Sequence, residues 1–258
     1  PVIEELNLIS GAIFEMYELT EGASVCVNGV GTLSIACEKA QEYLDAGYVK
    51  HIDTTTEIKV AEDNTLYTVD KQLEAYCAHC DKVVGWTPWR GTNLNTTEAL
   101  EHDHYILVQD VKTNSQIRIG ADATSETAAV VVDVCVDLNG HSVDSSSRAF
   151  AVYAGATLSL LNNSETQSFV VGGYKTDVGG VINMSGASSL NLYDGVYLES
   201  VAETFSSSGG IVNMATGTFN MYGGTLKGRS AKSGGAVYIG GGTFNMEGGL
   251  ITGGTANT

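Results

Sequence analysis

Residues 209–224 read GGIVNMATGTFNMYGG, and residues 234–249 read GGAVYIGGGTFNMEGG, so the same pattern returns 25 residues later. A third copy, GGVINMSGASSLNLYDG, occupies residues 179–195. The equivalent residues Phe219 and Phe244 are likewise separated by 25 residues. Internal repeats of roughly 20 to 50 residues are typical of proteins built from stacked units.

Apolar and polar residues alternate within each copy. The equivalent triplets are Leu190-Asn191-Leu192, Phe219-Asn220-Met221 and Phe244-Asn245-Met246, and an earlier copy places Leu158 32 residues before Leu190. Alternation with a period of two is typical of a strand that buries one face. Each copy has short strands, Gly-rich turns and no room for a helix. One copy cannot bury its apolar face alone, so the copies must stack as coils.

Stacking at the strand spacing of about 4.8 Å turns equivalent residues into columns. We predict one interior column of Leu190, Phe219 and Phe244 and a second of Leu192, Met221 and Met246. The outward column is Asn191, Asn220 and Asn245, whose amides can hydrogen-bond from coil to coil. A propeller or a sandwich needs longer antiparallel strands and larger repeats. The predicted fold is therefore all-β, a right-handed parallel β-helix.

The composition limits the partners. The 258 residues are enough for one large all-β domain or two ordinary domains. Thirteen Lys and Arg against thirty Asp and Glu give a net charge of −17. Such a charge repels phosphates and anionic lipids, so we expect no nucleic-acid partner. No apolar stretch of about 18 residues occurs, so we expect no membrane insertion.

The two parts of the chain differ in composition. Residues 1–178 hold 26 acidic and 10 basic residues, whereas residues 179–258 hold 4 and 3, together with 19 of the 31 glycines. The regular apolar positions of the second part argue against disorder. The chain begins at Pro1 without a leader, which is consistent with a processed secreted protein and equally with a cloned fragment.

The first third has a different pattern. Residues 33–46 carry apolar residues at helical spacing, which predicts one short α-helix. We predict an N-terminal strand segment at residues 1–30, a cap region with this helix and the CxxC loop at residues 31–100, and parallel β-helix repeats at residues 101–258. A cap is expected because the end of a β-helix otherwise exposes an apolar interior.

The run VDVCVDLNGHSVDSSSRAFAVYAGATLSLLNN at residues 132–163, followed by GGTFNMEGGLITGGTA, resembles a known family. It is similar to the pectin-lyase-like right-handed β-helix domains of large surface proteins from Gram-positive gut and rumen bacteria. The resemblance covers roughly residues 100–258 and extends more loosely toward residue 30. It implies a β-helix with a helical N-terminal cap in an extracellular or cell-surface protein, and says almost nothing about a ligand.

A candidate metal site begins at Cys77-Ala78-His79-Cys80 and continues downstream with His102 and His104. A C-x2-C turn is half of a zinc ribbon, because two thiolates can reach one tetrahedral ion and later histidines can supply the remaining ligands. We predict structural zinc bound by Cys77, Cys80, His102 and His104. A local disulfide and two free thiols remain alternatives, since no second C-x2-C is present.

Three other cysteines have their own predictions. Cys26 and Cys37 lie 11 residues apart and can form a disulfide in an oxidising compartment, or Cys37 can pack as a small apolar residue of the predicted helix. Cys135 lies among valines in a strand. We predict that it is buried and inert.

Acidic residues are the candidates for catalysis and for calcium. β-Helix enzymes that cleave polysaccharides need clustered carboxylates, either for calcium or as an acid and base pair. The candidates in the repeat half are Asp177, Asp194, Glu199, Glu203 and Glu247, which do not recur at the coil period. A solvated surface explains them more simply, and ordinary outward-facing strand positions explain Asp133, Asp137 and Asp144 better than a calcium site does.

We therefore expect a non-catalytic extracellular or cell-surface module with a structural or adhesive role. Its expected partners are glycans or a host or cell-wall surface, or further copies stacked end to end as a homo-oligomer. A polysaccharide lyase or glycoside hydrolase of the β-helix type is the alternative. Exposed tyrosines in a column would suit sugar stacking, whereas inward-facing ones belong to the core. The tyrosines concerned are Tyr174, Tyr193, Tyr197, Tyr222 and Tyr238.

Overall fold

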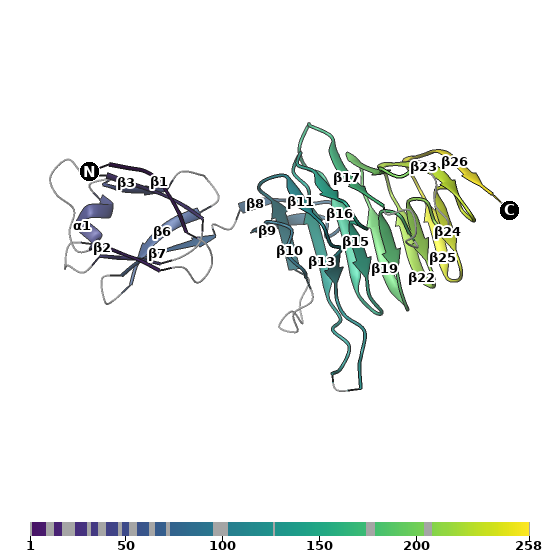
Figure 1. Ribbon diagram of the computed structural model, residues 1–258, viewed down its shortest axis with the longest axis horizontal. Helices are drawn as coiled ribbons and strands as arrows, with labels where there is room; N and C mark the ends of the chain where they lie inside the picture. The colour runs from purple at the N-terminus through teal and green to yellow at the C-terminus, as the bar shows by residue number, and fades with distance from the viewer. Residues whose placement is uncertain are drawn as a thin grey trace. The chain divides into compact units, whose positions relative to one another are not determined.

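Two compact units make up the chain, Pro1–Leu73 and Glu74–Thr258, and both are drawn in Figure 1. The computed structural model describes residues 2–8, 13–16, 24–29, 32–35, 40–45, 48–51, 56–61, 65–70, 73–94, 103–125, 127–173, 179–203 and 208–257. None of the helices within these ranges is both long enough and apolar enough to cross a membrane.

The first unit contains two small sheets and one helix in its described residues. A parallel sheet has the order β1 (Val2–Leu8), β3 (Ser24–Gly29), β5 (Val49–His51). A mixed sheet has the order β2 (Ile13–Met16), β4 (Thr32–Ile35), β7 (Thr65–Asp70), β6 (Thr56–Val60). The helix is α1 (Ala40–Asp45).

The predicted helical cap of the β-helix is wrong. The described residues of Glu74–Thr258 contain strands and no helix, and α1 belongs to the first unit and has only six residues. The helical spacing in residues 33–46 includes residues that form the end of β4 instead. Thr32 and Ile35 are β-branched and prefer strands, so periodicity alone misjudged this segment.

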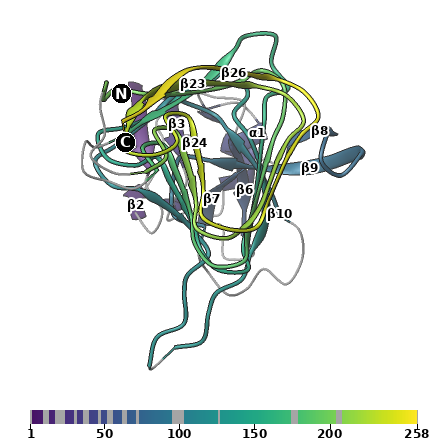
Figure 2. The same cartoon turned by 90° about the vertical axis from the view of Figure 1, so that its right-hand side faces the viewer.

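The second unit is a parallel β-solenoid of about five turns, built from three sheets. Sheet 1 has the order β8 (Leu73–Cys77), β9 (Lys82–Trp89), β10 (Asp103–Leu107), β13 (Asp133–Asp137), β16 (Thr157–Leu161), β19 (Ser188–Leu192), β22 (Gly217–Met221), β25 (Thr243–Met246). Sheet 2 has the order β11 (Val111–Thr113), β14 (Val143–Ser145), β17 (Ser168–Gly172), β20 (Val196–Ser200), β23 (Thr225–Ala231), β26 (Leu250–Ala256). Sheet 3 has the order β12 (Ile117–Ile119), β15 (Phe150–Val152), β18 (Ile182–Met184), β21 (Val212–Met214), β24 (Val237–Ile239). Successive coils overlap when the solenoid is viewed end-on, as in Figure 2.

The predicted strand register is confirmed. Leu158 aligns with Leu190, Leu190 with Phe219, and Phe219 with Phe244. Leu190 and Phe219 are fully buried, and the ring of Phe219 stacks on that of Phe244 with centroids 4.9 Å apart. In the second predicted column Leu192 and Met221 are fully buried, whereas Met246 on β25 is 47% exposed.

The predicted amide ladder on the outer face of sheet 1 is also confirmed. Asn220 Nδ2 donates to Asn191 Oδ1 at 2.9 Å, and Asn245 Nδ2 donates to Asn220 Oδ1 at 2.8 Å. Asn191 Nδ2 in turn donates to Ser159 Oγ at 2.9 Å. The same outward column continues through Cys135 to His104, where the chain turns back over it.

That covering segment is the hairpin formed by β8, residues 78–81 and β9. Its contacts with the outer face of sheet 1 include a hydrogen bond between His79 and Tyr193 of 3.0 Å. Under the hairpin, the outward residues Cys135, Asp137 and Leu161 are fully or almost fully buried. The hairpin therefore creates a second, smaller buried region on the outside of the solenoid.

Candidate metal centre

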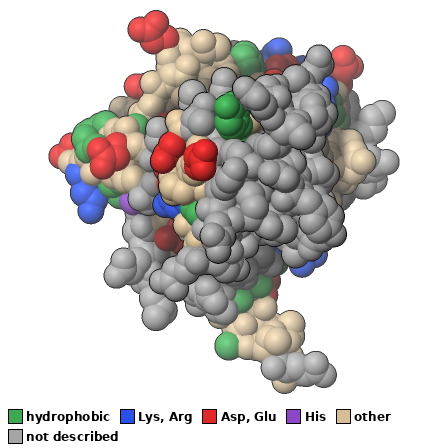
Figure 3. Space-filling view, turned by 90° about the vertical axis from the view of Figure 1, so that its left-hand side faces the viewer, with side chains coloured by type: hydrophobic (Ala, Val, Ile, Leu, Met, Phe, Trp, Pro, Cys, Tyr) green, Lys and Arg blue, Asp and Glu red, His purple; other side chains and the backbone are tan. Residues whose placement is uncertain are grey.

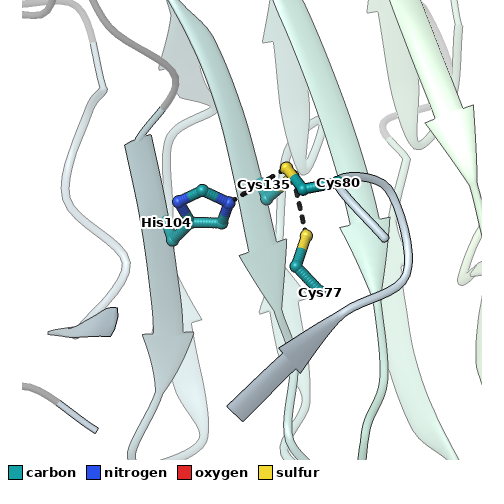
Figure 4. Close-up of side chains that lie close together, drawn as sticks. All are labelled: Cys77, Cys80, His104 and Cys135. Carbon is teal, nitrogen blue, oxygen red and sulfur yellow. Dashed lines mark hydrogen bonds between the residues drawn. The ribbon is translucent and has the colours of Figure 1, made fainter. Parts of the chain in front are cut away.

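Four side chains converge beneath the hairpin, as Figure 4 shows. Cys77 ends β8, and Cys80 lies in the turn that follows. His104 projects from β10 and Cys135 from β13. Three separate segments of the chain thus supply one cluster, which we call the Cys3His cluster.

The four donor atoms are close enough to share one ion. All lie within 4.8 Å of one another. The Sγ atoms of Cys77 and Cys135 are 3.5 Å apart, and Cys80 Sγ lies 3.2 Å from His104 Nε2. Cys77 and Cys135 are fully buried, while Cys80 and His104 are half-buried.

Strand register places two of the four side chains. His104 aligns with Cys135 across the parallel pair of β10 and β13. Val134 and Val136 belong to the interior core, so Cys135 between them points outward, because successive strand residues face opposite sides. Cys135 thus lies on the outer face of β13, where its sulfur is available as a ligand.

The hairpin turn orients the other two. Backbone N–H groups of Cys80 and His79 hydrogen-bond to the Cys77 sulfur, as happens when a short turn wraps around a thiolate. Asp81 follows with a φ of 52°, in the left-handed region. Its carboxylate accepts a hydrogen bond of 2.5 Å from the Tyr76 hydroxyl across the turn. These contacts hold Cys77 and Cys80 on the same side of the turn.

The cluster favours one thiolate before any ion is considered. The hydrogen bond between the Cys77 and Cys135 sulfurs is the main cause that lowers the pKa of Cys77 to about 5. Burial is the main cause that raises the pKa of Cys80 to about 11. The pKa of Cys135 is also raised, chiefly by its hydrogen bond to Cys77 and then by burial. Negative charge is therefore concentrated on the fully buried sulfur of Cys77, where a cation would neutralise it.

Three of the four residues that the sequence suggested lie together in the cluster, namely Cys77, Cys80 and His104. His102 falls outside the described residues. Metal binding by these residues stays a prediction. Cys135 is buried, as predicted, but its place in the cluster was missed.

A sequence signal for Cys135 did exist. It lies 31 residues after His104, which is close to the coil period, so the two residues had to fall on adjacent coils. The alternation of Val134, Cys135 and Val136 also points the thiol outward when the valines are inside. Only the position of the hairpin over sheet 1 could not be inferred in this way.

The other acidic candidates are not gathered into a site. In the part of the chain that the structure describes, the Cys3His cluster is the one group of three or more His, Cys, Asp or Glu side chains placed to share an ion. Asp133 and Asp144 are exposed, whereas Asp137 is buried and burial raises its pKa. On the face drawn in Figure 3, acidic side chains lie at several separate points.

The proposed catalytic acids have structural contacts. Glu199 accepts hydrogen bonds of 2.6 Å from both Lys227 and Arg229, and Asp194 accepts the backbone N–H of Gly224 at 3.3 Å. Asp177 lies outside the described residues. Ion pairing and turn contacts account for Glu199 and Asp194 without a reaction.

Two of the candidate tyrosines, Tyr193 and Tyr222, form a stack and not an open platform. Tyr193 and Tyr222 stack face to face with centroids 5.0 Å apart, and His79 meets Tyr193 edge-on. Burial, followed by the nearby Tyr222, raises the pKa of Tyr193. A sugar packs against a free ring face, and Tyr222 covers one face of Tyr193 while His79 also contacts the ring, so these contacts disfavour Tyr193 as a sugar platform. Tyr174 lies outside the described residues.

The disulfide between Cys26 and Cys37 that the sequence allows is left open. Cys37 lies outside the described residues, so the bridge between Cys26 and Cys37 stays a prediction. No family model matches the chain, and no curated protein or solved structure matches it either. The candidate function therefore rests on the geometry of the Cys3His cluster and on the solenoid that carries it.

Proposed function

We propose that this chain is a non-catalytic structural module whose first coils are held together by a zinc ion bound to Cys77, Cys80, His104 and Cys135. One observation carries the proposal: four donor atoms from three segments lie within 4.8 Å of one another. Three thiolates and an imidazole are a usual ligand set of structural zinc sites. Catalytic zinc sites instead have three protein ligands and an open position for water.

The spacing of the donors fits a tetrahedral ion. Zn–S bonds of about 2.3 Å place two sulfur ligands about 3.8 Å apart, and a sulfur and a nitrogen about 3.6 Å apart. The corresponding separations are 3.5 Å for Cys77 and Cys135 and 3.2 Å for Cys80 and His104. A small expansion of the cluster would therefore accommodate the ion.

Zinc accounts for the cluster better than the alternatives do. A disulfide would join two of the three cysteines and leave the third beside His104 without a function. Three neutral thiols do not suit the cluster, because its hydrogen bonds lower the pKa of Cys77 to about 5 and so favour a thiolate, which a cation would neutralise. Soft thiolate ligands favour zinc over magnesium or calcium.

The ion would act as a clamp. It would join the hairpin turn to β10 and β13, two neighbouring strands of sheet 1. Cys77 and Cys135 are 58 residues apart in the sequence, so the clamp would close a long loop of the unfolded chain. A bound ion stabilises the folded state because the unfolded chain lacks the preformed site.

Metal content tests the proposal directly. The full chain, purified with reductant and zinc and then dialysed without chelator, is expected to hold one zinc ion per molecule by plasma mass spectrometry. Replacement by Co²⁺ is expected to give the strong visible absorption of a tetrahedral thiolate site. Cys135→Ser is expected to lower zinc affinity at least about 100-fold, because it removes one of four ligands.

Cys26→Ser is the matched control, since it removes a thiol from β3 of the first unit and leaves the Cys3His cluster intact. It is expected to bind zinc like the wild type. Wild-type protein that remains free of zinc under these conditions would refute the metal centre.

For the whole protein we propose an extracellular or cell-surface role, with glycans or a host or cell-wall surface as partner. The resemblance of residues 132–163 to pectin-lyase-like domains of Gram-positive surface proteins supports it, as does the net charge of −17. Binding to plant, mucin and cell-wall polysaccharides, measured by affinity electrophoresis, is the test. Retardation by one class identifies the partner, whereas no retardation by any class would contradict an adhesive role.

A further inference from the structure

A buried carboxylate lies beside the Cys3His cluster. Asp137 is fully buried and is the second residue after Cys135 on β13. Its Oδ1 accepts the backbone N–H groups of Asn139 at 2.8 Å and Asn163 at 3.0 Å. Its Oδ2 accepts the side-chain Nδ2 of Asn163 at 2.8 Å. These three bonds tie Asp137 to its own turn and to the turn of the next coil.

The Asn163 amide extends this network to the hairpin. An amide nitrogen has two hydrogens, and the second bond from Asn163 Nδ2 goes to the backbone oxygen of Tyr76 at 2.7 Å. Tyr76 directly precedes Cys77 in β8. The chain Asp137, Asn163, Tyr76 thus connects the strands that carry two of the four cluster residues, Cys135 and Cys77.

The carboxylate fixes the direction of the amide. Both carboxyl oxygens of Asp137 accept hydrogen bonds here, so Asn163 turns its Nδ2, and not its Oδ1, toward Asp137. The second N–H then faces the Tyr76 carbonyl. Burying a carboxylate costs free energy unless hydrogen bonds satisfy it, and here they do so while aiming the amide at the hairpin.

We infer that Asp137 and Asn163 are positioning residues of the metal centre, which set the main chain at Cys77 against Cys135 so that both sulfurs meet the same ion. This inference rests on the proposed zinc site. Groups that orient metal ligands from outside typically change metal affinity about 10- to 100-fold when they are lost. The effect on affinity should therefore exceed that of an ordinary hydrogen bond between coils.

The test compares four variants of the full chain. Asn163→Ala removes both hydrogen bonds that the Asn163 side-chain amide donates. Asp137→Asn places the N–H donors of two side-chain amides against each other. The exchange Asp137→Asn with Asn163→Asp restores a donor and an acceptor between the two side chains but turns a carboxylate toward the Tyr76 carbonyl. Asp122→Asn is the control, because Asp122 also accepts a backbone N–H from the next coil, that of Ala154 at 3.2 Å, and makes no part of this network.

Four measurements separate positioning from general stability. Zinc affinity is measured by competition with a chromophoric chelator, and the geometry by the visible spectrum of the Co²⁺ form. The rate of alkylation of Cys77 in metal-free protein, followed by peptide mass spectrometry, reports whether the hairpin still holds the thiol. Thermal melts of the metal-free protein report stability alone.

We expect Asn163→Ala and the exchange variant to bind zinc about 10- to 100-fold more weakly than the wild type and to expose Cys77 to faster alkylation. The exchange variant should bind zinc no more tightly than Asn163→Ala, because its carboxylate opposes the Tyr76 carbonyl, and Asp122→Asn should keep wild-type affinity. Wild-type zinc affinity in Asn163→Ala or in the exchange variant would overturn the positioning role and leave the zinc site standing. A wild-type protein that binds no zinc would overturn both.

Discussion

Trp86 meets the ring of His104 edge-on, with centroids 5.2 Å apart and ring planes at 83°. The indole is fully buried, and its Nε1 donates to the backbone oxygen of Ala75 at 3.0 Å. One side chain of β9 therefore contacts β8 and the imidazole at once. Trp86→Ala should lower both the free energy of unfolding, by about 3–5 kcal/mol, and the affinity for zinc, measured by denaturant melts and chelator competition.

Trp89 supplies the matched control on the same strand. It belongs to the interior core and stacks on Phe150 with centroids 6.4 Å apart. Trp89→Ala should lose comparable stability without changing the zinc affinity of the folded molecules. Equal losses of affinity in the two variants would show that the contact between Trp86 and His104 has no specific effect.

The left-handed turn residue Asp81 gives a second prediction. At a φ of 52° a side chain other than Gly, Asn or Asp costs roughly 1–2 kcal/mol. Asp81→Val should therefore weaken zinc binding and lower the melting temperature. Asp81→Gly should retain affinity within a few fold, since it relieves the turn while losing the bond from Tyr76. A Val variant equal to the Gly variant in both measurements would rule out backbone strain at this turn.

Two stacked phenylalanines give a third prediction. Phe219 is fully buried, whereas Phe244 is only partly buried against the same core. Phe219→Ala should reduce the free energy of unfolding by about 3–5 kcal/mol, and Phe244→Ala by clearly less. Urea titrations followed by circular dichroism measure both values. A larger loss at Phe244 would contradict the burial order along the solenoid.

A pair of glycines gives a fourth. Gly217 has a φ of 122°, and a Cβ there would lie 2.1 Å from the backbone oxygen of Ser188. Gly217→Ala should destabilise by about 2–4 kcal/mol. At Gly241 a Cβ would meet nothing closer than 3.5 Å, so Gly241→Ala should stay within about 1 kcal/mol of the wild type. The comparison uses thermal melts, and a Gly217→Ala protein as stable as Gly241→Ala would exclude this close coil contact.

The repeat half of the fold could be predicted because its signal is local and recurs. The spacing from Phe219 to Phe244 gave the register directly, and the alternation around Asn220 gave both the interior column and the amide ladder. Each coil repeats the same alternation of inward-facing and outward-facing residues. An error in one copy is therefore exposed by the next.

The first third offered no such repetition. Helical spacing in residues 33–46 competed with the strand preference of Thr32 and Ile35, and nothing in the sequence decided between them. The prediction of the Cys3His cluster was incomplete for another reason, since Cys135 joins the cluster only because the hairpin folds back over sheet 1. The contact between Cys77 and Cys135 spans 58 residues, and no local pattern reports it.

The alignment of His104 with Cys135 has a consequence for how the coils wind. A slip of one residue between β10 and β13 would turn Cys135 into the interior and bring Val134 or Val136 under the hairpin, because neighbouring strand residues face opposite sides. A slipped chain would then lack a ligand. Under the proposed chemistry, zinc would bind tightly only to molecules whose first coils are in the correct register. The zinc content of a preparation would then measure the fraction of such molecules.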